Sequence, residues 1–339
     1  MAGVTCLFAL AVTGCSAGSD STSDAAAPAE SEQASSPSPS SSATPSSTGT
    51  SYAPYVSAVE ANDNDSAGSP ATYNLAFVIS GGSGCTPKWN GTNAIGDSAV
   101  KSRISALTAS GATARVSFGG ASGKELAATC DSVSELTRAY GEALDAAGSS
   151  QADFDIEGDE LTDADSVALR SRAIAALQEE RPDLEVSFTL PVMPSGLDAD
   201  SLALLTSANK YDVQVSTVNL MTMNYGESYA GDMGGYAITS ATAAQAQLKK
   251  IFGTTDADAW KGMALTSMIG TNDVDNETFT LADAAEVRTF AEEKGISWVS
   301  MWSTFRDQQC EDGSASDDAL TNCSGVEQSA GAFAEAFSE

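Results

Sequence analysis

The sequence contains no histidine among its 339 residues. This absence excludes Ser-His-Asp and Cys-His catalysis, zinc bound by histidine, and acid-base chemistry by an imidazole. The six cysteines show no Cys-x-x-Cys spacing either, so we expect neither a metal site nor a cofactor. Any proton transfer must therefore be carried out by carboxylates.

Basic residues are also scarce. The chain has 16 Lys and Arg against 46 Asp and Glu, a formal net charge of -30, and no basic residue precedes Lys88. Such a charge repels phosphate backbones and anionic lipid surfaces. We therefore expect a neutral or cationic partner and no binding of nucleic acid.

The apolar run at residues 4–13 is too short to span a bilayer and is typical of the core of a signal peptide. It leads into Val-Thr-Gly-Cys, which resembles a bacterial lipobox with Cys15 as the lipidated residue. Ordinary signal cleavage nearby is the alternative. We predict a signal segment at residues 1–15 and an extracellular protein, either secreted or held at the bacterial cell surface by a lipid on Cys15.

Residues 16–50 consist almost entirely of Ser, Ala, Thr, Pro and Gly with a few acids. This composition buries too little apolar area to offset the entropy of ordering, which predicts a disordered linker. We expect residues 51–339 to form a single folded domain, and the protein to be a monomer that contacts the membrane only through the lipid.

Cys6 and Cys15 lie in the predicted signal segment. The four cysteines beyond it form an even set in a chain expected to be exported, which favours disulfides. The short interval between Cys310 and Cys323 suggests that these two pair, leaving Cys85 with Cys130. The sequence alone permits three pairings.

Short β-branched runs alternate with helical patterns after the linker, as in parallel strands joined by crossover helices. The helical patterns include residues 97–110 and 163–180, both with Asp-rich starts. The predicted strands lie at residues 55–59, 73–79, 114–118, 152–156, 185–189, 215–221, 262–268 and 298–301. Eight such units predict an α/β fold of the (β/α)8 TIM-barrel type. A doubly wound open sheet is less favoured, because no Gly-rich phosphate turn follows the first strand.

The fourth predicted strand alternates acidic and apolar residues. Its period of two directs Asp153, Asp155 and Glu157 to one face, and Phe154 and Ile156 to the other. A solvated acidic strand is disfavoured because parallel barrel strands are buried on both faces, and a hard-cation site is the second alternative. Neighbouring carboxylates also raise the pKa of one of them, as a general acid at neutral pH requires.

This stretch resembles the Asp-x-Asp-x-Glu motif of glycoside hydrolase family 18. Ser-Phe-Gly-Gly at residues 117–120 is similar to the Ser-x-Gly-Gly motif of that family, one βα unit earlier. Residues 219–225 and 300–303 resemble its sixth-strand and last-strand segments, so four motifs occur in the expected order. The likeness covers roughly residues 52 to 337 and is strongest to bacterial chitinases of the chitinase D group.

The resemblance implies a chitinase that uses a retaining, substrate-assisted mechanism. Glu157 is then the general acid, Asp155 orients the acetamido group of the substrate, and Asp153 supports Asp155. Strict register aligns the family's catalytic tyrosine with Met223. Whether Met223 or Tyr225 faces the sugar stays open, and we predict Tyr225.

Further residues are expected to bind the sugar chain. Trp302 at the end of the last strand offers a stacking face, Met221 and Met223 shape the pocket, and Asn224 stands where the family usually has Asp. Trp89, inside an expected disulfide loop, is a candidate for an outer subsite. The expected partner is chitin or its N-acetylglucosamine oligosaccharides, while an endo-β-N-acetylglucosaminidase acting on glycans and a non-catalytic chitin-binding lectin are the alternatives.

Overall fold

The computed structural model describes residues 49–82, 84–315 and 317–339. The predicted signal segment, the predicted lipidation site at Cys15 and nearly all of the predicted linker lie outside these residues. No helix within them is both long and apolar enough to cross a bilayer.

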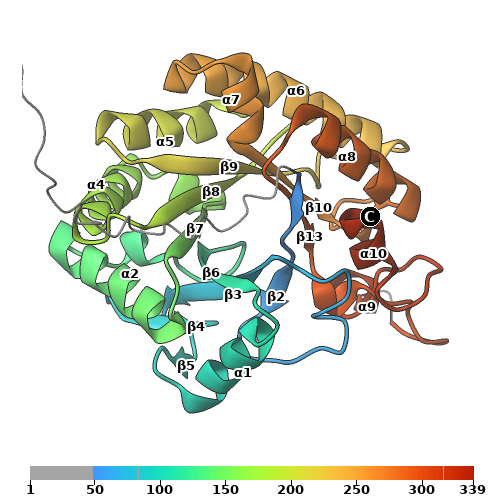
Figure 1. The fold of residues 1–339 in the computed structure, drawn as a ribbon, viewed down its shortest axis with the longest axis horizontal. Coiled ribbons are helices and arrows are strands. Elements are labelled where there is room, and N and C mark those ends of the chain that lie inside the picture. Colours follow the sequence, from blue (N-terminus) through green and yellow to red (C-terminus); the bar gives the residue numbers. More distant parts are fainter. Residues whose placement is uncertain (1–48, 83, 316) are drawn as a thin grey trace, which may run out of the picture. The chain divides into compact units, whose positions relative to one another are not determined.

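Parallel strands form the centre of the molecule, and helices lie outside them (Figure 1). The main ladder path runs β1-β13-β10-β9-β8-β7-β6-β3, with the small strands β4 and β5 continuing beyond β3. These strands are β1 (Ser51–Tyr52), β2 (Tyr55–Ser57), β3 (Thr72–Ser80), β4 (Pro87–Trp89), β5 (Asn93–Ala94), β6 (Thr113–Gly119), β7 (Gln151–Asp155), β8 (Glu185–Pro191), β9 (Val215–Met221), β10 (Met263–Met268) and β13 (Trp298–Trp302). A separate antiparallel pair consists of β11 (Gly270–Thr271) and β12 (Thr278–Phe279). All eight predicted strands are confirmed.

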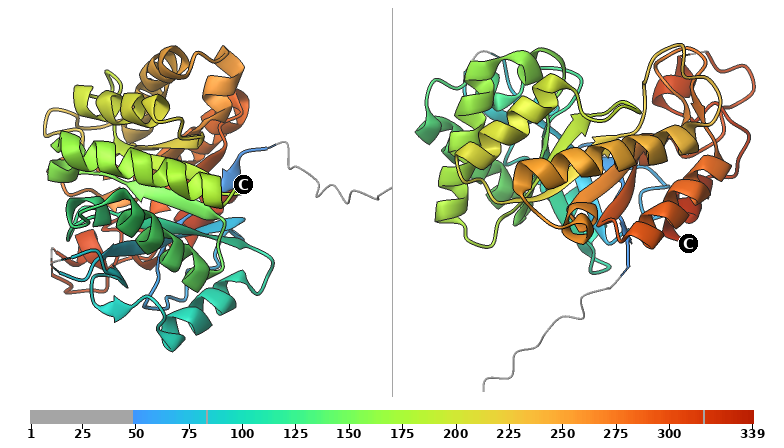
Figure 2. Two further views of the ribbon diagram at one scale, coloured as in Figure 1. Left: turned by 90° about the vertical axis from the view of Figure 1, so that its left-hand side faces the viewer. Right: turned by 90° about the horizontal axis from the view of Figure 1, so that it is seen from above.

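The helices follow the strands in alternation, and α4 and α5 pack along the outside of the sheet (Figure 2). They are α1 (Ser98–Thr108), α2 (Val133–Ala147), α3 (Gly158–Thr162), α4 (Ala164–Glu180), α5 (Ala199–Lys210), α6 (Met233–Phe252), α7 (Asp256–Lys261), α8 (Leu281–Lys294), α9 (Asp318–Thr321) and α10 (Ala332–Ser338). Acidic caps begin several of them, as predicted. The side chains of Asp97 and Asp163 accept backbone N–H groups at the starts of α1 and α4.

The start of the path is interrupted at Pro54. β1 pairs with β13, whereas β2, two residues later, pairs with β3. Among the described residues no ladder joins β2 to β13, so the paired strands do not form a closed ring. The alternating parallel strands and helices confirm the predicted mixed α/β fold.

Aromatic rings fill the space between strands and helices on one side of the sheet. Phe154 on β7 lies between Phe118 and Phe188 of the neighbouring strands, with centroids 5.2 and 5.7 Å away, and Tyr140 of α2 covers it. All four rings are buried. Because side chains alternate along a strand, packing Phe154 outward directs Asp153 and Asp155 to the inner face.

Two disulfides connect loops of the fold. Cys85 pairs with Cys130 and Cys310 with Cys323, as the spacing suggested. The first joins the loop after β3 to the segment before α2. The second closes a short segment between β13 and α10.

Candidate active site

Asp153 lies at the centre of a set of hydroxyl groups inside the sheet. Its Oδ2 accepts hydrogen bonds from Tyr55 at 2.9 Å and Ser117 at 2.7 Å, and its Oδ1 accepts from Ser187 and Thr189, each at 2.8 Å. The residue is almost fully buried. Four hydroxyl donors satisfy a carboxylate fully, so Asp153 is held as an ordered acceptor without a basic partner.

Strand register brings these groups together. Asp153 is paired with Ser117 on β6 and with Ser187 on β8, while Asp155, one layer higher, is paired with Gly119 and Thr189. In parallel strands paired residues point to the same face. The serine of the Ser-x-Gly-Gly motif therefore serves as a donor to Asp153.

Gly119 fits tightly against the end of β7. Its φ is +103°, and a Cβ atom there would lie 2.1 Å from the carbonyl oxygen of Asp155. The next backbone N–H, of Gly120, donates to that same oxygen at 2.9 Å. Only glycine allows this approach, which fixes the backbone of Asp155.

Asp155 and Glu157 form the upper part of the acidic ladder. Burial raises the pKa of Asp155 well above its ordinary value, and the charges of Glu157 and Asp153 raise it further. Burial also raises the pKa of Glu157 to about 7, although the hydrogen bond from Asp155 opposes this shift. The pair therefore retains a proton near neutral pH, as a general acid must.

A cavity at the carboxyl ends of the strands, here called the catalytic cavity, contains both acids. Trp302, Met221, Met223 and Asn224 also line it, so the structure brings these predicted residues together with Asp155 and Glu157. Its remaining lining consists of Tyr55, Phe77, Ala121, Thr189, Thr266, Met268 and Asp273. Phe77 stacks on Trp302 with centroids 5.6 Å apart and an interplanar angle of 21°.

The structure does not bring Tyr225 into this cavity, so its predicted position was wrong. Its ring packs against Tyr229 and Tyr236, and its hydroxyl accepts a hydrogen bond from Ser240 of α6 at 3.4 Å. The physical reason lies at Asn224, whose φ of 55° ends the extended conformation after Met223. Met223 faces the cavity instead.

The prediction that Trp89 lines an outer subsite is also wrong. It is completely buried in β4, which folds back antiparallel on β3, and its Nε1 donates to the carbonyl of Ile95 at 3.3 Å. The antiparallel pairing of β4 with β3 places this ring in the core. Trp89 therefore acts in packing and offers no face to a sugar.

Three residues of the cavity were missed or left without a role by the sequence analysis. Tyr55 occupies the first predicted strand, and among the described residues it is the only tyrosine lining the catalytic cavity. Phe77 lies within the second predicted strand, residues 73–79, without a predicted role of its own. Asp273 follows β11, and its charge raises the pKa of Glu157.

Asn224 and Asp273 connect two loops at the rim. The Asn224 amide donates to the Asp273 carboxylate, and the Asp273 backbone N–H donates to the Asn224 amide oxygen, both at 3.1 Å. Nearby, buried Glu277 accepts the backbone N–H of Gly226 at 2.7 Å. These contacts fix the turn that follows Met223.

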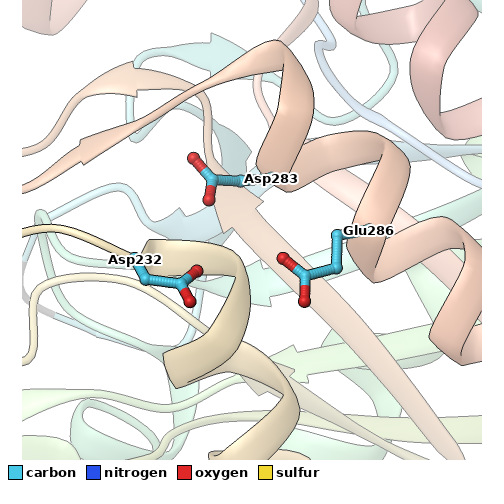
Figure 3. Close-up of side chains that lie close together, drawn as sticks. All are labelled: Asp232, Asp283 and Glu286. Carbon is cyan, nitrogen blue, oxygen red and sulfur yellow. The ribbon is translucent and has the colours of Figure 1, made fainter.

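A second acidic cluster lies away from the cavity. Asp232 precedes α6, Asp283 and Glu286 belong to α8, and the three carboxylates face one another (Figure 3). Asp283 accepts backbone N–H groups from Gly234 and Thr280, and Asp232 caps α6. The cluster thus joins the starts of two helices, and we assign it no ligand.

A separate cavity of about 520 Å³ opens at the amino ends of the strands. Its lining includes Arg115, whose guanidinium lies 3.9 Å from the ring centre of Trp298. None of the three acids of the ladder lines it. We therefore assign the chemistry to the catalytic cavity at the opposite ends.

Comparisons with known proteins identify relatives of this chain. No family model matches the sequence. The chain is 34% identical over 275 residues to the probable bifunctional chitinase/lysozyme of Escherichia coli (strain K12), covering 76% of this chain and 31% of that protein. It is 33% identical over 248 residues to endochitinase 11 of Metarhizium anisopliae, covering 69% and 47%. The chain thus spans less than half the length of these relatives.

Solved structures of chitinases share the fold of this chain. The catalytic domain of a hyperthermophilic chitinase from Pyrococcus furiosus matches with a TM-score of 0.73 at 28% identity, covering 84% of this chain and 93% of that chain. A family 18 chitinase from Pseudoalteromonas aurantia shares the fold, with a TM-score of 0.54 at 13% identity and coverage of 75% and 94%. From its motifs, its sequence relatives and its fold, the chain belongs to glycoside hydrolase family 18.

Proposed function

We propose that this protein is a chitinase that hydrolyses β-1,4-linked N-acetylglucosamine chains with Glu157 as its general acid. One observation carries the proposal: Asp153, Asp155 and Glu157 lie in a ladder whose top opens into a cavity lined by Trp302. The ladder supplies a proton near neutral pH, and the ring supplies a face for a sugar.

Glu157 starts the reaction by donating its proton to the glycosidic oxygen. The bond from the anomeric carbon to that oxygen breaks, and the carbonyl oxygen of the substrate's own acetamido group bonds to the anomeric carbon. The Glu157 carboxylate then removes a proton from water, which opens the oxazolinium ring with retention of configuration. Because the substrate provides the nucleophile, no second carboxylate nucleophile is needed.

Asp155 and Asp153 assist this cyclisation. Asp155 lines the cavity directly and is paired with Glu157, so it can orient the acetamido N–H and offset the positive charge that develops on the ring. Asp153, which accepts hydrogen bonds from four hydroxyls, supports Asp155 from the layer beneath it. The names of the cited relatives each include chitinase activity, one of them together with lysozyme activity, which supports the substrate class.

We also propose that the strands complete a (β/α)8 barrel, with β1 and β2 as one strand interrupted by Pro54. Proline cannot donate to a ladder, which accounts for the interruption. Hydrogen bonds run on both sides of the gap: Ala53 donates to Val299 at 2.9 Å, and Asn74 donates to Pro54 at 2.9 Å. A barrel also accounts for a site at the carboxyl ends of the strands.

Export stays a prediction, as do lipidation of Cys15, cell-surface or secreted localisation and the monomeric state. Two disulfides support an oxidising compartment. Labelling with a fatty-acid analogue in a bacterial host, with Cys15→Ala as the control, tests the anchor. A protein that is equally labelled with and without Cys15 would exclude it.

The activity is tested by following the products of chitin pentasaccharide by NMR. We expect cleavage to give the β-anomer first, because the mechanism retains configuration. Initial formation of the α-anomer would exclude substrate assistance. Cleavage of a high-mannose glycopeptide alone would favour the endo-β-N-acetylglucosaminidase, and binding without cleavage would favour a lectin.

A further inference from the structure

A buried cation lies at the opposite end of the strands from the catalytic cavity. Arg115 of β6 lines the cavity of about 520 Å³ at the amino ends, here called the amino-end cavity. Only 7% of this residue is exposed, and it forms no ion pair with any described residue. A buried charge without a partner costs free energy, so Arg115 indicates a ligand of opposite charge.

Neighbouring side chains hold the guanidinium group of Arg115 and leave one of its edges free. Its Cζ lies 3.9 Å from the ring centre of Trp298, and its Nη1 donates to the Asn74 side-chain oxygen at 2.7 Å. Asn74 is fixed in turn, because its Nδ2 donates to the carbonyl of Ala53 at 2.8 Å. Nε and Nη2 of Arg115 have no hydrogen-bond partner in the described part of the chain. These two N–H groups form the edge that binds both oxygens of a carboxylate.

The acids near Arg115 leave its charge uncompensated. Ser187 lines the amino-end cavity and donates to Asp153 at 2.8 Å, so the cavity meets a hydroxyl group there and not the carboxylate. Glu185 and Asp258 also line the cavity, but both are exposed. Burial lowers the pKa of Arg115, and the charges of Asp153 and Glu185 oppose this shift without reversing it.

The charges of the lining favour a ligand with a single negative charge. The four ionisable side chains are Arg115, Lys261, Glu185 and Asp258, whose charges cancel. Only Arg115 is buried, while the other three are exposed at the rim. A second negative charge on the ligand would meet the two acids without a further cation, which disfavours a phosphate dianion.

The uncharged part of the lining suits hydroxyl groups. Hydroxyl side chains make up much of the wall, and they include Thr72, Ser216, Thr217, Thr254 and Ser297. A cavity of about 520 Å³ also has room for a ligand of several carbon atoms. Both features match a carboxylate that carries a short hydroxylated chain.

Two further atoms on the wall lack hydrogen-bond partners. They are Nε1 of Trp298 and Oε1 of Gln151, both buried and both unpaired with the described residues. Gln151 directly precedes Ala152, which is paired with Val116, so Gln151 lies beside Arg115 in the sheet. Most buried polar atoms in proteins are hydrogen-bonded, so a wall with unpaired atoms next to an unpaired cation supports a ligand site.

We propose that the amino-end cavity binds a small hydroxylated monocarboxylate, such as a sugar acid. The carboxylate accepts hydrogen bonds from Nε and Nη2 of Arg115, and the hydroxyl groups of the ligand face the Ser and Thr side chains of the wall. The acids of the ladder do not line this cavity, so the site is separate from the proposed chitinase activity.

Titration calorimetry of the whole protein with gluconate tests the site. Sorbitol has a carbon chain of the same length without the carboxylate, and acetate has the carboxylate without the hydroxyl groups. We expect gluconate to bind more tightly than acetate, and sorbitol not to bind. Chloride and phosphate at the same ionic strength control for screening.

Substitution of the cation gives the decisive comparison. Arg115→Met should lower the affinity for gluconate by roughly 10- to 100-fold, because the charge-assisted hydrogen bonds are lost. Arg138→Met removes an exposed arginine of α2 and should leave the affinity unchanged. Thermal melting of each variant shows whether it is folded.

A second pair of variants avoids the interior. Lys261→Glu reverses a charge at the exposed rim of the amino-end cavity, and should lower the affinity by roughly 3- to 10-fold at low salt. Lys101→Glu makes the same change on the exposed surface of α1, away from the cavity, and should have little effect.

The outcomes decide the inference without reference to chitin cleavage. Absence of gluconate binding would overturn it, as would equal affinity in the unmodified protein, Arg115→Met and Lys261→Glu. Equal binding of sorbitol would exclude recognition of the carboxylate. Equal binding of chloride or phosphate would show a general anion site and overturn the proposed ligand class.

Discussion

A side-chain hydrogen bond joins Asp155 and Glu157 at the carboxyl end of β7. Both groups are withdrawn from water, so the charged form of each is disfavoured. The protonation of Glu157, the proposed acid, is therefore coupled to the protonation of Asp155.

The pH profile of turnover follows from this coupling. Burial raises the pKa of Glu157 to about 7, so the proposed acid is protonated below that pH and loses its proton above it. We expect kcat on chitin oligosaccharides to fall as pH rises through about 7. Steady-state kinetics between pH 4 and pH 10 measure this limb, and a midpoint below pH 5 would contradict the assigned environment of Glu157.

The same shift predicts a pH-dependent cost in stability. An ordinary glutamate ionises near pH 4.5, whereas folded Glu157 keeps its proton to about pH 7, so stability is lost as pH rises between these values. Glu157→Gln removes this loss and should stabilise the protein, by up to roughly 3 kcal/mol above pH 7 and by much less below pH 4.5. Chemical denaturation at pH 4 and pH 8 measures the difference. Glu293→Gln on the exposed side of α8 is the control, and an equal effect of both variants at pH 8 would oppose the prediction.

Asp153 should be the most sensitive position of the ladder for stability. Asp153→Ala leaves four buried hydroxyl groups without their common acceptor. We expect a loss of about 3 to 5 kcal/mol, as for other buried polar networks that lose one partner. Urea denaturation tests this, and a loss below about 1 kcal/mol would mean that the hydroxyls find other partners.

Two tyrosines offer a matched pair of substitutions. Tyr55→Phe removes a hydroxyl that donates to Asp153 beside the catalytic cavity, and should lower kcat by roughly 10- to 100-fold, about 1.4 to 2.8 kcal/mol. Tyr225→Phe removes a hydroxyl that meets only Ser240 among the described residues, and should change kcat by less than about 3-fold. Steady-state kinetics compare the two. The reverse order would restore Tyr225 as the residue that acts on the substrate.

Much of the fold follows from local pattern. Parallel strands that are buried on both faces consist mainly of apolar residues. Asp153, Asp155 and Glu157 are the exception, and they indicated the site because burying carboxylates costs free energy. The period of two also predicted that Phe154 packs outward. These features depend only on the alternation of side chains along a strand, so they can be predicted from the sequence.

The errors came from backbone turns that break this alternation. Asn224 adopts a left-handed conformation after Met223, and the chain at Trp89 folds back on β3. No periodic signal marks either event. Asp273 reaches the cavity through a loop, so its distance from Glu157 depends on tertiary packing and not on sequence spacing.

Glu157→Gln tests the central claim most directly. The amide keeps the shape of the side chain but cannot donate the proton, so we expect kcat on chitin oligosaccharides to fall by at least roughly 1,000-fold while calorimetry still detects oligosaccharide binding. Activity retained within about tenfold of the unmodified protein would contradict the assignment of Glu157 as the general acid.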